Sequence, residues 1–502
     1  MRQTATIPRR EAGPGSTVTS LPRRLVSDSA IYGLGGVANQ ALAVILVPIY
    51  ANVLGVSNYG TLALVNTTLS FATSIVTLAL PQAFFRSYLM ENAEEHGRAS
   101  VLRTTLGLRL VISLAGLVVL LLLAFPLTRL LFGDTANLPI LLVMGPIVFC
   151  DTLNLVPLSF LRAERHAAAY AALSFSRAVL GSLMIIVFVV VLQLGVFGVV
   201  LGSLVSAIVV AAAGVAVLVR ARRVGVAWDR PLVKHMLVFS LPLVPASVAA
   251  WTLNLSDRYL LQAFVGNQAV GVYSAGYTIG LVINALAVAP FSLAWAAIFW
   301  EIANKPGARQ TYARVMTGFV IFAGFVALGL SALSTDALRL LFRPDFEPSR
   351  FVVPFSAFAY VLYGIYSIGA TGLNIEGRTG VLPVTLWASA IANVALNLVL
   401  IPTIGYLGAA VSTTLGYGLL AVSTTAAGQR YYPVPWDLPR IAGSLLLAAG
   451  LAAAALLGPD HLIWRLGCIA AYPALVVLLR IVNMNDLALL RAALPGGRAA
   501  SR

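Results

Sequence analysis

Long apolar segments follow one another along almost the whole chain, and short polar or charged stretches separate them. A run of about 20 apolar residues can cross a hydrocarbon core of about 30 Å as a helix, whereas membrane β-strands alternate apolar and polar positions. The runs here are unbroken, so the pattern predicts an all-α membrane protein with fourteen membrane-spanning helices. The predicted spans are approximately 30–53, 61–84, 105–125, 138–160, 168–191, 196–219, 235–256, 269–292, 312–334, 351–373, 381–401, 406–428, 441–458 and 462–480.

Several markers in the first half of the chain return in the second half about 210 residues later. Internal repeats of this kind are typical of transporters built from two related bundles. The matched pairs are LGVSNYG at 54–60 with VGNQAVGVY at 265–273, GVFG at 195–198 with GYLG at 405–408, Pro81 with Pro290, and Glu164 with Glu376.

The repeat divides the chain into two six-helix lobes. Because six is an even number of spans, both lobes enter the membrane in the same direction, as parallel repeats. We expect one lobe at 28–222, the other at 223–434, and two further helices at 435–482. A basic cytoplasmic tail at 1–27, rich in Arg, Pro, Gly and Ser, is expected to be disordered, and 483–502 forms a second cytoplasmic tail.

Composition and charge place the chain in a membrane and orient it there. Charged residues make up only 10% of the chain, against about 25% in soluble domains, and the mean hydropathy is +0.91. Most of the 33 Lys and Arg residues flank one set of span ends, which predicts a multi-pass protein of the plasma (inner) membrane with both termini cytoplasmic. That bias also explains the net charge of +15 without nucleic acid.

No motif in the sequence carries the chemistry of an enzyme. A G-x-x-x-x-G-K-[ST] phosphate loop is absent, the four histidines have no ligand spacing, and both cysteines fall in apolar segments. The largest outer loop, about 335–350, has a balanced set of charges and is expected to be a solvated surface. We therefore expect a protein without enzyme activity, metal or cofactor, which binds, reorients and releases a substrate.

Four segments, in order, carry a resemblance that covers about residues 25–480. They are LGVSNYGTLAL at 54–64, SDRYLLQAFVGNQAVGVY at 256–273, NIEGR at 374–378 and IPTIGYLGAA at 401–410. The chain is similar to the oligosaccharide flippases of polysaccharide biosynthesis, in the MOP exporter superfamily, which also contains multidrug antiporters and flippases of lipid-linked peptidoglycan precursors.

The resemblance implies a V-shaped pair of lobes that works by alternating access. Its implied cargo is an undecaprenyl-diphosphate-linked oligosaccharide that moves from the inner to the outer leaflet for a lipopolysaccharide or exopolysaccharide. Further partners would be membrane lipids, a proton or sodium counter-ion, and neighbouring polymerases and glycosyltransferases. Two alternatives remain open: a multidrug or cation antiporter of the same superfamily, and a membrane polymerase or ligase whose catalytic charges would have to lie at 335–350.

Five polar residues are candidates for substrate contact in a water-filled cavity. Arg177, inside the fifth predicted span, either reaches the inner interface or binds phosphate, for which Arg offers paired donors. Arg86, at the inner end of the second span, is a topology anchor or a substrate ligand. Asn39, Gln40 and Asn254 either bind sugar hydroxyls or form interhelical hydrogen bonds.

Asp151 lies in the middle of the fourth predicted span. An acid in the hydrocarbon core costs about 2.5–3.5 kcal/mol on insertion scales, so it should face the protein interior or water. Three interpretations stay open for it: a coupling site for a proton or sodium ion, an ionic partner of Arg177, or part of a solvated cavity wall.

Two groups of charged residues are candidates for gates. Asp257 and Arg258 end the seventh span on the outer side, where a structural lock is expected, although adjacent helical side chains diverge by roughly 100° and should not pair with each other. The second group lies in matching inner turns of the two lobes and consists of Arg162, Glu164, Glu376 and Arg378. These residues either form ion pairs between the lobes, as an inner gate, or are ordinary solvated helix ends. Pro242 and Pro245 should kink the seventh span.

Overall fold

The computed structural model describes residues 21–91, 97–221 and 225–482, with side chains from Leu46 onward except at 90, 91 and 297. Every regular element in these ranges is helical, which confirms the all-α prediction for the described part of the chain. Most of the predicted tail at 1–27, and all of the tail at 483–502, lie outside the described residues.

The first half of the chain forms long helices with two π-helical segments. They are α1 (Leu21–Thr77), α2 (Leu80–Arg86), η1 (Ser87–Glu91), α3 (Arg98–Phe132), α4 (Leu138–Ala163), α5 (Ala167–Ile185), η3 (Ile186–Val191) and α6 (Gly195–Arg220). The second half is more often interrupted. Its elements are α7 (Arg230–Ser240), η4 (Leu241–Leu243), α8 (Val244–Leu255), α9 (Asp257–Phe264), α10 (Asn267–Gly280), η5 (Asn284–Val288), α11 (Ala289–Ala303), α12 (Ala308–Ala332), α13 (Ser334–Leu341), η6 (Pro344–Phe351), α14 (Val353–Gly369), α15 (Thr371–Ile375), α16 (Val381–Ile404) and α17 (Tyr406–Tyr431). A final hairpin consists of α18 (Leu438–Leu457) and α19 (Leu462–Leu478).

Twelve helical segments among the described residues are long and apolar enough to cross a membrane. The number differs from fourteen for two reasons. Helix α1 runs through the first predicted span and most of the second, joined at Gly55, whose φ of 74° and ψ of 169° interrupt the helical geometry. Helix α19 has only 17 residues, although it is also apolar.

Three spans are broken in their middle, which bends the chain without ending the crossing. After α1, Leu78 and Ala79 adopt left-handed φ values of 49° and 52° before α2 begins. The seventh span changes to a 3-10 turn at Leu241–Leu243, so the kink predicted from Pro242 and Pro245 is confirmed. The eighth span contains the π-helical segment η5 between α10 and α11.

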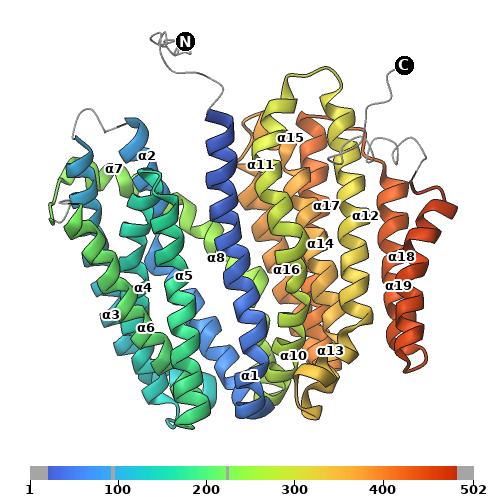
Figure 1. Ribbon diagram of the computed structural model, residues 1–502, viewed down its shortest axis with the longest axis horizontal. Coiled ribbons are helices and arrows are strands. Elements are labelled where there is room, and N and C mark those ends of the chain that lie inside the picture. The colour runs from blue at the N-terminus through green and yellow to red at the C-terminus, as the bar shows by residue number, and fades with distance from the viewer. Residues whose placement is uncertain (1–20, 92–96, 222–224, 483–502) are drawn as a thin grey trace.

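The helices gather into two bundles that meet along α1 (Figure 1). Helices α1–α6 form one bundle, with α1 at the face that meets the second, and α8–α17 form the other, while α18 and α19 lie together at the far edge of the second. The seventh span belongs to both, because α7 packs against α2 and α3 whereas α8 packs against α16 and α17. It therefore crosses from one bundle to the other at its 3-10 turn.

The two bundles have separate hydrophobic cores at one end and share a core at the other. Phe84, Phe160 and Met236 belong to a core built from the first half together with α7. The shared core instead joins Leu54 and Tyr59 of α1 to buried side chains of the second half. Those side chains include Val272, Ala275, Phe342 and Phe346. We call this end, which contains the turns at Gly55 and Gly266, the glycine-turn end; it is the end predicted to face outward.

Candidate transport site

The two bundles meet backbone to backbone at the glycine-turn end, where small residues allow close contact. A β-carbon on Gly60 of α1 would overlap the carbonyl oxygen of Asn267 in α10, and one on Gly271 would overlap the carbonyl oxygen of Val56. The contact is reciprocal, since each bundle offers a glycine to a carbonyl of the other. Larger side chains at these two positions would force the bundles apart.

A second layer of contacts lies further along the same interface. Thr68 of α1 shares a hydrogen bond of 2.8 Å with the Tyr259 hydroxyl, and the ring of Phe71 lies 4.5 Å from the ring of Trp251. Trp251 also lies 5.9 Å from Tyr259, but its indole nitrogen is buried without a partner. Aromatic rings therefore line the interface between α1 and the seventh span.

Asp151 and Arg177 are brought together inside the first bundle. Arg177 on α5 donates from Nε to one carboxylate oxygen of Asp151 at 2.9 Å and from NH2 to the other at 3.1 Å. Its remaining nitrogen, NH1, donates to Ser206 on α6. The two side chains are 26% and 30% exposed, so the pair is accessible as well as bonded. This is the two-pronged geometry in which Arg binds carboxylates and phosphates.

Asp257 and Arg258 form a buried ion pair of 2.8 Å, so the expectation that adjacent residues would not pair was wrong. The divergence of roughly 100° holds for the first side-chain bonds, but the long Arg258 side chain folds back and also donates to the Asn254 carbonyl at 3.0 Å. Tyr273 and Thr413 donate to the second carboxylate oxygen of Asp257.

The Arg258 guanidinium lies over the rings of Tyr273 and Tyr277, at 5.3 and 4.6 Å from their centres. The charge is thus held by a carboxylate, a carbonyl and two aromatic faces, all from the second half of the chain. The hydrogen bonds and ring contacts of this arrangement stabilise the second bundle, and Tyr59 of α1 lies near enough for its hydroxyl to interact with the charge of Arg258.

The candidate inner gate residues pair within their own bundles. The Tyr88 hydroxyl donates to Glu164 at 2.5 Å, and Arg98 lies 3.9 Å from the same carboxylate. The Arg162 guanidinium lies 5.4 Å from the Phe85 ring. In the second half, Arg378 lies 5.3 Å from the Tyr431 ring, and Glu376 is exposed. Between the two turns, no ion pair forms among the residues that the structure describes.

The remaining candidates have local partners. Arg86 lies over the Phe239 ring at 4.7 Å and thereby links α2 to α7. Asn254 donates to the Ala250 carbonyl at 2.8 Å and accepts a hydrogen bond from Tyr417, as expected for an interhelical polar contact. Asn39 and Gln40 lie on α1, but their side chains fall outside the described part of the chain.

Arg109 is a buried residue that the sequence analysis missed. It is 1% exposed, and it donates to the carbonyls of Val76 at 2.9 Å and Thr77 at 3.0 Å, where α1 ends. The partial negative charge of a helix C-terminus compensates the guanidinium in place of an acid. The sequence signal for a buried charge was the position of Arg109 itself, which lies inside the third predicted span, 105–125.

A second missed group consists of uncharged polar side chains in the second bundle. Asn393 and Asn397 on α16 are fully buried and bond to each other at 3.1 Å, each with a further atom unpaired. Ser412 on α17 is also buried with an unpaired hydroxyl. Two Asn residues four positions apart in one predicted span were the sequence signal, because they fall on one helix face.

The segment 335–350 is helical, and its charged side chains are exposed or partly exposed, as expected of a solvated surface, although several of them form ion pairs. It forms α13 and η6, and two of its charged residues, Asp336 and Arg339, pair with residues of the final hairpin. Arg465, which is 4% exposed, pairs with Asp336 at 2.7 Å and with Asp460. Arg339 pairs with Asp460 at 2.9 Å and with Glu347 at 2.8 Å.

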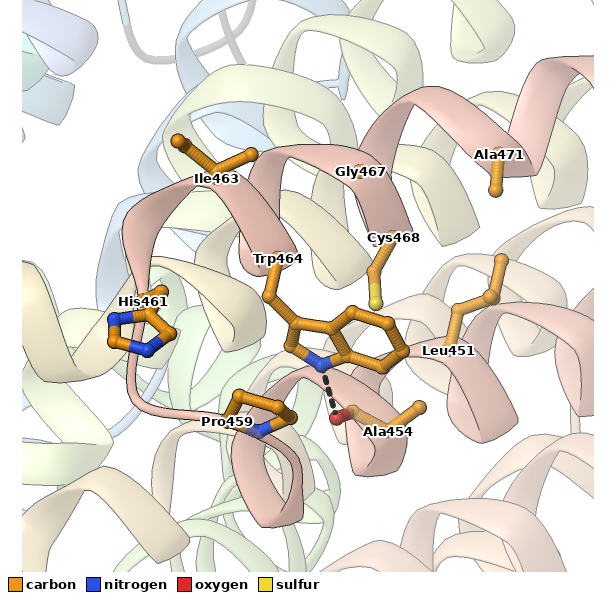
Figure 2. Close-up of a pocket in the computed structure, with 9 residues that line it drawn as sticks. All are labelled: Leu451, Ala454, Pro459, His461, Ile463, Trp464, Gly467, Cys468 and Ala471. Atoms are coloured by element: carbon orange, nitrogen blue, oxygen red, sulfur yellow. Dashed lines mark hydrogen bonds between the residues drawn. The ribbon is translucent and has the colours of Figure 1, made fainter.

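An open apolar hollow lies on the final hairpin and not between the bundles (Figure 2). The indole nitrogen of Trp464 donates to the Ala454 carbonyl there at 2.9 Å, which closes one side of the hollow. Its lining is mostly apolar and includes the polar ring of His461 (Figure 2). In the described ranges, no group of three His, Cys, Asp or Glu residues is placed to hold a metal ion.

Comparison with solved structures relates the arrangement to known membrane proteins. The lipid II flippase MurJ in an inward closed conformation superposes with a TM-score of 0.74 at 15% identity, over 91% of this chain and 99% of MurJ. An inward-facing multidrug resistance MATE family transporter of the MOP superfamily gives 0.61 at 15% identity, over 81% and 95%. The Vibrio cholerae MATE transporter VcmN gives 0.57 at 15% identity, over 82% and 97%.

Sequence comparison gives the family. An uncharacterized membrane protein of Methanocaldococcus jannaschii, MJ1068, is 24% identical over 202 residues, and the match covers 39% of each protein. The chain thus spans about two fifths of the length of that curated relative. The model of the family described as polysaccharide biosynthesis protein matches residues 25–302, more than half of the chain. The resemblance noted from the sequence is therefore confirmed: this multi-pass membrane protein belongs to the polysaccharide biosynthesis protein family and has the MOP superfamily fold.

Proposed function

We propose that the protein is a transporter that flips an undecaprenyl-diphosphate-linked oligosaccharide from the inner to the outer leaflet of the plasma membrane by alternating access. A diphosphate and its sugars cannot enter hydrocarbon unassisted, because burying unpaired charge and unbonded hydroxyls is costly. The protein must therefore offer a polar route between its bundles. The family description and the superfamily fold support a role in handling such a cargo.

The observation that carries the proposal is the accessible pair of Arg177 and Asp151 inside membrane-spanning helices. Charged residues at this depth are costly and are typically retained for function. Arg177 presents Nε and NH2 to a carboxylate, the edge by which a guanidinium also binds two phosphate oxygens. The substrate diphosphate would replace Asp151 on this edge, while Ser206 holds the third nitrogen in place.

The finer architecture, fourteen spans in two parallel repeats, belongs to the same proposal. Backbone geometry at matched positions supports it. In the first turn, the Glu164 backbone N–H donates to the Phe160 carbonyl at 2.9 Å. In the matching turn, the Glu376 backbone N–H donates to the Gly372 carbonyl at 3.1 Å. The backbone N–H groups of the next two residues also have corresponding acceptors in the two turns. Gly55 and Gly266 have similar positive φ values of 74° and 102°. The proposal includes cytoplasmic termini, as the distribution of basic residues predicts.

The partners remain those expected from the sequence. They are the lipid-linked substrate, membrane lipids, a counter-ion that is a proton or sodium, and polymerases and glycosyltransferases of the same pathway. Asp151 is poorly suited to bind the counter-ion while both its oxygens accept from Arg177. Coupling to an ion at Asp151 would thus require the hydrogen bonds between Arg177 and Asp151 to break first.

The test follows the lipid-linked sugar in cells that depend on this protein. Arg177→Ala, and to a lesser degree Arg177→Lys, should lower surface polysaccharide at least about tenfold, because lysine cannot form the paired contact. The intermediate should accumulate with its sugar facing the cytoplasm. Arg129→Ala is the matched control, because that guanidinium lies over Phe125 at the glycine-turn end. Accumulation on the outer face would instead indicate a polymerase and contradict the proposal.

An antiporter of small organic cations is the second candidate, because the fold is also that of MATE transporters. It would require export that depends on a cation gradient and persists when polysaccharide synthesis is blocked. A polymerase is less well supported, because Asp336, Arg339, Glu347 and Arg350 all form ion pairs that fasten the final hairpin or each other.

A further inference from the structure

Two side-chain amides cross between the bundles at the glycine-turn end. Asn52 of α1 donates from Nδ2 to the Leu341 carbonyl at 2.8 Å and accepts the Arg343 backbone N–H at 2.9 Å. In the opposite direction, Gln262 of α9 donates from Nε2 to the Leu131 carbonyl at 3.2 Å. Each bundle therefore sends one amide to the backbone of the other.

The two bonds are related by the spacing of the sequence repeat. Gln262 lies 210 residues after Asn52, and Leu341 lies 210 residues after Leu131. In both cases the donor lies three or four residues before a glycine turn, at Gly55 or Gly266, and the acceptor lies at the end of a helix of the other bundle, α13 or α3. Two parallel lobes related by a two-fold axis make each contact between them twice, with the roles of the lobes exchanged, as in a symmetric dimer interface.

The surrounding contacts define what these bonds hold together. The reciprocal contacts of Gly60 and Gly271 and the shared hydrophobic core lie at the same end, with the Tyr59 ring 5.8 Å from that of Phe346. None of these contacts is an ion pair. The bundles cannot separate at this end without breaking both amide bonds, whereas separation at the opposite end would leave them intact.

We propose that Asn52 and Gln262 are paired latches of the gate at the glycine-turn end. They hold that gate closed while the transport site is open or occluded toward the other side, and both must release before the gate opens. The latches are uncharged, so ionic strength and pH near neutrality do not set them. This inference rests on the alternating access of the proposed function.

The two latches differ in strength. Asn52 uses both atoms of its amide, whereas the Gln262 carbonyl oxygen is buried without a partner. Loss of Asn52 should therefore open the gate more than loss of Gln262. Breaking a hydrogen bond of ordinary strength shifts such an equilibrium about fivefold.

The experiment measures gate opening with a reporter cysteine in the full chain. Cys150 and Cys468 are first replaced by serine, and Ala275→Cys is introduced, because Ala275 is fully buried in the shared core. Labelling by a membrane-impermeant maleimide added outside intact cells reports exposure of this core. Asn52→Ala should raise the labelling rate about tenfold or more, and Gln262→Ala about fivefold. Gln262→Glu, which removes the donor and sets a carboxylate against the Leu131 carbonyl oxygen, should raise the rate at least as much as Gln262→Ala.

The matched control is Asn58→Ala. Asn58 lies near Asn52 on α1, but its amide bonds the Leu54 carbonyl of its own helix at 3.1 Å. Equal labelling rates for the Asn52, Gln262 and Asn58 variants would overturn the latch. The result is independent of cargo: faster labelling without any flipping activity would remove the proposed function and keep the gate. Normal flipping with unchanged labelling would contradict the latch and keep the proposed function.

Discussion

Individual charged residues inside the membrane-spanning helices have three different kinds of partner. Arg177 binds a carboxylate and remains accessible, Arg258 is enclosed by a carboxylate and aromatic rings, and Arg109 binds only backbone carbonyls. Accessibility distinguishes a charge that can exchange partners from one that holds a structure together. By this criterion Arg177 is suited to a substrate, whereas Arg109 and Arg258 are structural.

A prediction at this scale concerns Arg109. Arg109→Ala should lower the stability of the protein in detergent by about 1–3 kcal/mol, because two carbonyls at the end of α1 lose their donors. Thermal unfolding of the purified protein measures the effect. Arg103→Ala on the same helix, where the side chain is exposed, serves as control and should change little. Equal melting temperatures for the two variants would show that Arg109 does not hold the break between α1 and α2.

The same residues show what a sequence pattern can give at this scale. The pairing of Asp151 with Arg177 was one of three alternatives, since both lay at similar depth in neighbouring spans. The pairing of Asp257 with Arg258 was missed because Tyr273 and Thr413, which fix the carboxylate, come from remote helices. The role of Arg109 depends on the chain break before Pro81, which was not predicted, although Pro81 marks its place.

At the scale of elements, the final hairpin packs its apolar residues against α12 and is further attached to the second bundle by charges at one end. The connection between α18 and α19 carries Asp460, which pairs with Arg339 and Arg465, while Tyr472 bonds Ser444 at 2.7 Å within the hairpin. Hydrogen bonds and charge from Arg339, with a contribution from Arg465, hold the pKa of Asp460 below its usual value. The carboxylate is exposed, so salt will weaken the attachment.

This pKa gives a pH prediction with a definite sign. Because the folded pKa of Asp460 is lowered, its contribution to stability is present above the unfolded pKa of about 3.9 and is lost as pH falls through the folded value. Melting temperatures of the wild type and Asp460→Asn should therefore differ at pH 6 and converge in more acidic solution. A constant difference across this range would show that the charge of Asp460 does not attach the hairpin.

Helix breaks were predictable only where a residue type causes them. Pro242 and Pro245 predicted the bend between α7 and α8, because proline removes a backbone donor and clashes with the preceding turn. The break between α1 and α2 comes just before Pro81 in the first turn of α2, so a proline marks it too, and tertiary contacts from α3 stabilise it. Gly55 separates two predicted spans that lie within the bounds of α1, because its φ of 74° and ψ of 169° are not helical and form the turn between them.

At the scale of the whole molecule, the bundles share a core at the glycine-turn end and have separate cores at the other. The repeat markers at 54–60 and 265–273 that suggested two lobes are the segments where the lobes meet. The sequence indicated the lobes because their repeat survives at this contact. It could not indicate which end is closed, because that depends on the conformation and not on the pattern.

Alternating access requires the distance between the bundles to change at the end opposite the glycine turns. His166 and Lys305 are exposed turn residues at that end, one in each bundle. Cysteines at these positions, with Cys150 and Cys468 replaced, allow pulsed electron spin resonance to measure the distance between two spin labels in lipid nanodiscs.

The most direct test is this distance with and without an undecaprenyl-diphosphate-linked oligosaccharide. We predict that the lipid shifts the distribution between a longer and a shorter distance, and that Arg177→Ala abolishes the shift while Arg129→Ala preserves it. A single distance that is unchanged by the lipid would contradict the account.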